Sequence, residues 1–170
     1  MLGLDVFISG GDEVAPYRTV GMEVLRHLQQ MFQKDLNVPL AIGTWDFRID
    51  PPAVVPPGTL AARSLSMVER TNCIVVVFGA QLPKVTCQEV RHAFKLRQRG
   101  ERVEVKVFLS RLRRTRSHSD FLRRIKTKFH EEIVYSQYES KLDFQAKLFT
   151  TLTPFVIEKM REAGITLGAA

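Results

Sequence analysis

Short apolar runs alternate with stretches of helical periodicity along the whole 170-residue chain. Runs rich in Val, Ile, Leu and Phe predict five strands, at 4–9, 38–45, 73–78, 103–109 and 133–135. Apolar residues spaced three or four positions apart predict five helices, at 17–33, 59–70, 86–99, 120–129 and 141–163. Strands and helices that alternate in this way form a parallel sheet with helices on both faces.

The segment 73–78 is apolar at every position, which is typical of a strand that is covered on both sides. We therefore predict an α/β fold of the flavodoxin-like kind, a three-layer sandwich around a five-stranded parallel sheet. The length suits one domain, placed at 1–164, with 165–170 as a C-terminal tail that could continue into a longer protein. Pro154 is expected to kink the last helix or to split it.

Candidate chemistry lies where the predicted strands end, because ligands of such sheets bind at the carboxyl edge. Ser9 and Gly10 end the first strand, Trp45 ends the second, and Glu89 lies on the helix after the third. A carboxylate there could stabilise positive charge on a ribose while an N-glycosidic bond breaks. Trp45 could stack on a base, or could simply be half-buried packing, and Ser9 with its glycines could be a tight turn.

The loop 46–58 contains two Pro-Pro pairs and is predicted to contain no strand. Asp46 and Arg48 lie at its start, where Arg48 could bind a phosphate through two parallel hydrogen bonds. The alternative is that Asp46 and Arg48 form a surface ion pair, which contributes about 0–1 kcal/mol.

Glu89 also fits a structural role. The tetrapeptide from Thr86 to Glu89 matches a capping box, in which Thr86 is the N-cap and Glu89 reaches back to it. The two roles are compatible, because a helix start at the sheet edge is where a ligand arrives.

Several classes of protein are not indicated. The chain has no GxGxxG fingerprint, P-loop or GxSxG elbow, and its four histidines have no metal-ligand spacing, so we expect neither a metal site nor a resident cofactor. Two cysteines make no disulfide framework. No apolar run approaches the roughly 20 residues of a membrane helix. We expect a cytoplasmic protein without a membrane partner.

The net charge of +7 is concentrated in one segment. Arg111 to Lys128 contains eight basic residues and one acid, Asp120, and therefore accounts for the whole excess. Such a segment favours an acidic protein partner. Nucleic acid is the less favoured alternative, because Phe121 is the only aromatic residue among the charges.

Three segments resemble TIR domains and their relatives, including SEFIR domains and bacterial TIR-like domains of unknown function. They are the opening strand LDVFIS, the strand segment ERTNCIVVVFG, and the helix start TCQEVRHAF. The resemblance implies that Glu89 cleaves the nicotinamide–ribose bond of NAD, a substrate and not a cofactor, in a signalling or defence role. It also implies that Cys87 lies beside the substrate and that self-association completes the pocket.

Two other functions remain open at this point. A non-catalytic adaptor of the same family would assemble through the loop 46–58 and the basic segment. A nucleoside deoxyribosyltransferase-like enzyme would share the fold type and a catalytic glutamate, since one fold serves many functions.

Overall fold

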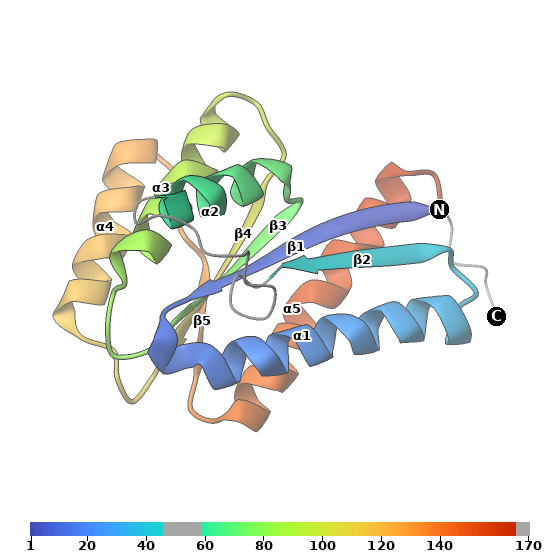
Figure 1. Cartoon of the computed structure of the whole chain (residues 1–170), viewed down its shortest axis with the longest axis horizontal. Helices are drawn as coiled ribbons and strands as arrows, with labels where there is room; N and C mark the ends of the chain where they lie inside the picture. Colours follow the sequence, from blue (N-terminus) through green and yellow to red (C-terminus); the bar gives the residue numbers. More distant parts are fainter. Residues whose placement is uncertain (46–58, 166–170) are drawn as a thin grey trace.

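The five strands form a single parallel sheet in the order β2-β1-β3-β4-β5, as seen in a computed structural model that describes residues 1–45 and 59–165 (Figure 1). The strands are β1 (Leu2–Gly10), β2 (Leu40–Trp45), β3 (Cys73–Phe78), β4 (Glu104–Ser110) and β5 (Tyr135–Tyr138). This arrangement confirms the predicted α/β fold with a five-stranded parallel sheet.

Helices cover both faces of the sheet and make three layers (Figure 1). One face packs against α1 (Ala15–Gln30) and α5 (Lys141–Glu162), and the other against α2 (Thr59–Arg70), α3 (Lys84–Gln98) and α4 (Arg116–Phe129). A 3-10 turn, η1 (Asp12–Val14), precedes α1, and a π-helical turn, η2 (Met31–Asp35), follows it.

The two faces have separate apolar cores because neighbouring strand residues point in opposite directions. In β1, Val6 and Ile8 belong to the core under α1 and α5, whereas Phe7 belongs to the core under α2, α3 and α4. Every residue of β3 is buried, as its continuous apolar sequence predicts. Ser9 follows the alternation of Phe7, which places it on the side of α2 and α3.

The fifth strand lies further along the chain than predicted. It covers Tyr135–Tyr138 and not 133–135, and Val134 is exposed. As the edge strand it pairs only with β4, so its sequence need not be apolar. Tyr138 anchors it, because the buried phenol donates to the Phe78 carbonyl over 3.0 Å.

The last two helices also differ from the prediction. α4 begins at Arg116, ahead of the expected 120, because Thr115 and His118 form a capping box there. α5 runs unbroken through Pro154, so of the two expected effects of this proline the split is wrong. Leu152 and Phe155, on either side of the proline, are both buried in the core and hold the helix together.

The C-terminal end of α5 closes on Gly164, which has a φ of 72°. The Ile165 N–H donates to the Met160 carbonyl over 2.9 Å, and Ile165 packs against the core. The ordered contacts therefore reach one residue into the predicted tail, and 166–170 lie outside the described residues. Within the described ranges, no helix is both long and apolar enough to cross a membrane.

Candidate functional site

The Ser9 hydroxyl donates a hydrogen bond to Oε2 of Glu89. Ser9 is the penultimate residue of β1 and is 2% exposed, whereas Glu89 comes from α3 and is 4% exposed. β1 and β3 are neighbours in the sheet, and the helices that follow them cover opposite faces. The contact therefore lies at the switch point of the sheet, where ligands of open α/β sheets bind.

The predicted capping box at Thr86 is wrong. α3 begins at Lys84, and the Cys87 N–H already donates to the Pro83 carbonyl over 2.9 Å. Thr86 is therefore a buried residue inside the first turn, and Glu89 lies in the second turn. Because Glu89 is not needed at the helix end, its carboxylate is available to groups from the neighbouring elements.

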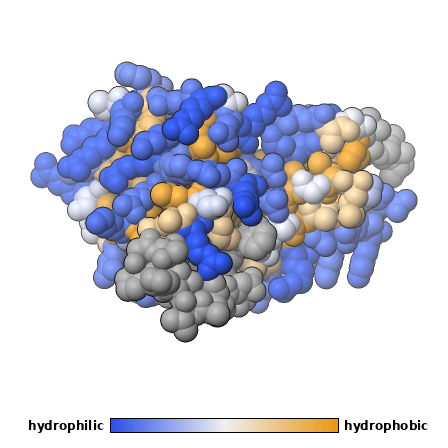
Figure 2. All heavy atoms as spheres, turned by 45° about the horizontal axis from the view of Figure 1, so that its top comes forward, coloured by the Kyte–Doolittle hydropathy of each residue, from blue (hydrophilic) through white to orange (hydrophobic). Residues whose placement is uncertain are grey.

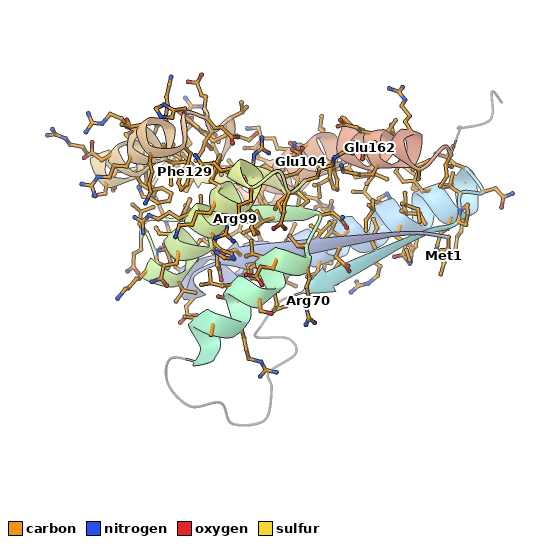
Figure 3. The ribbon with its side chains drawn as sticks, turned by 90° about the horizontal axis from the view of Figure 1, so that it is seen from above. Met1, Arg70, Arg99, Glu104, Phe129 and Glu162 are labelled. Atoms are coloured by element: carbon orange, nitrogen blue, oxygen red, sulfur yellow. The ribbon has the colours of Figure 1, made fainter. Side chains whose placement is uncertain are left out.

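Ser64 of α2 is a second hydroxyl beside the carboxylate, and it is 2% exposed. α2 and α3 lie side by side over the sheet, as Figure 3 shows from above. The single Ser64 proton can go to the Ala61 carbonyl, at 3.0 Å, or to Glu89. Sequence reasoning missed Ser64, although it lies one helical turn before the buried Val68 at a position that usually holds an apolar residue.

Arg18 of α1 approaches the same strand end from the opposite face. Its side chain is almost fully buried, and Nη1 donates to the Gly10 carbonyl over 3.1 Å. The sequence carried a signal for this residue, because Arg18 belongs to the buried stripe of α1 with Gly21, Leu25 and Leu28. A charged residue within an apolar stripe is expensive to bury unless it binds something.

Burial raises the pKa of Glu89 above its ordinary value. The hydrogen bonds from Ser9 and Ser64 and the positive charge of Arg18 oppose that rise, because each stabilises the ionised form. The carboxyl group is thus buried, contacted by two donors and close to a guanidinium. Such a group can stabilise a cationic centre once that centre displaces the hydroxyls.

The other predicted site residues lie in different parts of the structure, and two of them lie outside its described part. A Cβ on Gly10 would lie 3.0 Å from the Val77 carbonyl oxygen, so this glycine permits close packing of β1 on β3. Cys87 is buried in the core under α3, and burial raises its pKa, which keeps it a neutral thiol. Trp45 pairs in register with Phe7, at the last position of β2. Asp46 and Arg48 lie outside the described residues.

The loops after β1 and β3 touch each other at the sheet edge. A Cβ on Gly11 would lie 2.6 Å from Cγ of Pro83, and the Glu13 carboxylate accepts from the Gln81 N–H over 2.7 Å. These contacts hold the first turn of α3 against the end of β1. In the described part of the chain, no three His, Cys, Asp or Glu side chains are grouped to hold a metal ion.

No protein-family model and no curated protein sequence matches the chain. Among solved structures, the chain is similar to the CMP N-glycosidase BcmB of Clostridium botulinum, with a TM-score of 0.55 and 12% identity over 87% of this chain and 99% of that one. It is also similar to the homoserine dehydrogenase of S. aureus, with a TM-score of 0.45 and 15% identity over 81% of this chain and 33% of that one. The likeness to the N-glycosidase supports the fold alone. The likeness to the dehydrogenase is too weak to support any conclusion.

Proposed function

We propose that this protein cleaves the N-glycosidic bond of a nucleotide and that Glu89 is its catalytic carboxylate. One observation carries the proposal. Glu89 is the only acidic residue with a buried side chain in the described part of the chain, and it contacts Ser9 at the carboxyl edge of the sheet. Buried carboxylates are rare unless they are paired or functional.

In the proposed reaction, the bond between the anomeric carbon of the ribose and a ring nitrogen of the base breaks. The electron pair leaves with the base, and the carbon becomes positively charged. The ionised Glu89 stabilises that charge, either as a close counter-ion or through a transient ester bond to the carbon. Water then adds its hydroxyl group to the carbon, which breaks the ester bond if one has formed, and releases a proton to the solvent. Ribose hydroxyls replace the Ser9 and Ser64 hydroxyls as partners of the carboxylate.

The proposed substrate is NAD. Sugar hydrolases commonly use a second carboxyl group to protonate the leaving group. Nicotinamide leaves a pyridinium nucleotide as a neutral molecule and needs no such proton, which suits a site built around one buried carboxylate. The resemblance of the segment around Glu89 to TIR domains supports the same substrate.

A pyrimidine nucleotide is the second candidate. The fold similarity to a CMP N-glycosidase favours it. Cytosine would need a proton as it leaves, and the raised pKa of Glu89 gives that carboxyl group a larger protonated fraction than an exposed glutamate has.

The test compares the release of nicotinamide from NAD with the release of cytosine from CMP, over a range of protein concentrations that also covers self-association. Glu89→Gln is expected to lower the rate by about 100- to 1,000-fold, since it removes the charge that stabilises the transition state. Glu23→Gln is the matched control, because Glu23 is an exposed glutamate on α1. Turnover by Glu89→Gln at the parent rate would overturn the assignment. No release of either base at any concentration would favour the non-catalytic adaptor.

A further inference from the structure

Two basic side chains lie over aromatic rings that pack between α3 and α4. The rings of Phe94 and Phe129 stack across the two helices with centroids 5.6 Å apart. Arg91 of α3 lies over Phe121 at 5.5 Å, and Lys128 of α4 lies over Phe129 at 5.7 Å. These contacts hold the charged groups of both side chains over the rings.

Ion pairs neutralise only part of the charge on α4. Arg116 and Arg123 share Asp120, and Lys126 pairs with Glu132. Arg124 and Lys128 are exposed and have no acidic partner in the described part of the chain. They lie one helical turn apart, on the same flank as Phe121, which faces α3.

α3 adds two more cations. Arg91 and the exposed Lys95 also lie one turn apart, and neither forms an ion pair with a described acid. We name the four residues Arg91, Lys95, Arg124 and Lys128 the basic seam. Figure 3 shows nitrogen-tipped side chains that project from α4 away from the sheet, and Figure 2 shows a mostly hydrophilic surface on the face turned toward the viewer.

The surroundings of the basic seam favour a phosphate backbone over other anions. Protein interfaces are anchored by aromatic or apolar side chains. Of the large hydrophobic residues exposed in the described ranges, none lies on α4 and only Val85, in the first turn of α3, lies on either helix. Single-stranded nucleic acid is bound through exposed aromatic rings that stack on bases, and the rings here are covered. Duplex phosphates need only cations and hydrogen-bond donors, which the seam provides.

We propose that the basic seam binds the phosphate backbone of double-stranded nucleic acid without reading its sequence. Arg124 and Lys128 are four residues apart on α4, so they are separated by about 6 Å along the helix axis. A duplex carries one negative charge per roughly 1.7 Å of its axis, so several phosphates lie within reach of the seam. This proposal does not depend on the glycosidase assignment, since no residue of the seam contacts Glu89.

The test measures binding of a fluorescent, mixed-sequence DNA duplex by anisotropy over a series of salt concentrations. Binding is expected to weaken steeply with salt. The slope of log K against log salt should become shallower by about 0.9 for each phosphate that the variant Arg124→Gln/Lys128→Gln no longer neutralises. The matched control is Arg26→Gln/Lys34→Gln, which changes one exposed arginine and one exposed lysine beyond the opposite face of the sheet. It alters net charge equally and should retain both affinity and slope.

Three results would overturn the proposal. The first is an absence of salt-sensitive duplex binding by the parent protein. The second is an equal loss of binding in the control variant, which would indicate attraction by net charge alone. The third is equally tight binding of polyglutamate or of anionic phosphatidylserine vesicles, which would assign the seam to an acidic protein or a membrane surface. Thermal melting of both variants by circular dichroism establishes that they are folded.

Discussion

The Ser9 hydroxyl donates a hydrogen bond to the Glu89 carboxylate, which is 80 residues further along the chain. The contact joins the end of β1 to the second turn of α3, and it exists because β1 and β3 are neighbours in the sheet. Two residues that lie far apart in the sequence therefore form one polar unit inside an apolar layer. The stability of that unit depends on its protonation state, which leads to the first prediction.

The protein is expected to lose stability through Glu89 as the pH rises. Its folded pKa is raised by burial, so the native state favours the protonated carboxyl group. The stability that this proton provides is complete below the ordinary pKa of 4.5 and is lost as the pH rises through the folded value. Glu89→Gln, which is neutral at every pH, should remove this dependence.

The measurement is the free energy of unfolding in urea for the parent and for Glu89→Gln, from acidic to mildly basic pH. As the pH rises, the free energy of unfolding of the parent should fall relative to that of Glu89→Gln. A constant difference across that range would contradict the raised pKa.

Ser9→Ala removes a donor from the buried carboxylate and should destabilise the protein by about 1–3 kcal/mol at neutral pH. It should also raise the pKa of Glu89 further, because the Ser9 hydrogen bond lowers that pKa in the parent. Ser66→Ala is the control on exposed α2 surface, where changes stay within about 0.5 kcal/mol. Chemical denaturation of both variants distinguishes these outcomes, and equal small effects would mean that the Ser9 hydrogen bond is unimportant.

Arg18→Met tests the buried guanidinium at the switch point. The change leaves the Gly10 carbonyl without the donor that now lies 3.1 Å away, so the expected loss is about 1–3 kcal/mol. Arg26→Met on the same helix is exposed and should cost less than about 0.5 kcal/mol. Urea titrations of the two variants give the comparison. If both variants match the parent, Arg18 has no structural part in the site.

Gly79→Ala tests the contact between the loops after β1 and β3. The new Cβ would lie 2.7 Å from Cδ of Glu13, so the Glu13 carboxylate must move away from the Gln81 N–H, from which it accepts a hydrogen bond. Because the Glu13 carboxylate is the end of a flexible side chain, the expected cost is that of the lost hydrogen bond, about 0.5–1.5 kcal/mol. At Gly3 a Cβ would meet nothing within 4 Å, so Gly3→Ala is the matched control and should change stability little. A melting temperature for Gly79→Ala equal to that of the control would contradict this account.

The apolar pattern predicted the fold because burial on both faces leaves little choice of residue. β3 is the clearest case, since a run of six apolar residues corresponds to six buried positions. β5 was misplaced because an edge strand needs only part of its surface covered, and Tyr135–Tyr138 contains polar residues for that reason. Ile133 and Val134 are better strand formers by type, but Val134 is exposed.

The candidate site was predicted only in part. The position of Glu89 after β3 and of Ser9 at the end of β1 followed from the rule for strand ends, and the structure brings these two together. Ser64 and Arg18 were missed because each belongs to a helix whose pattern was taken from its apolar members alone. The capping box was wrong because a four-residue motif matches many helix positions, and here Pro83 starts the helix earlier.

α3 carries Glu89 on its buried side and Arg91, two residues later, on the flank that faces α4. Both residues belong to one helix of 15 residues, so a ligand that shifted α3 at Arg91 would also shift the Glu89 carboxylate relative to the Ser9 hydroxyl. The two proposed ligands would then be thermodynamically linked through this helix. Whatever a bound duplex did to nucleotide affinity, a bound nucleotide would do to duplex affinity by the same factor.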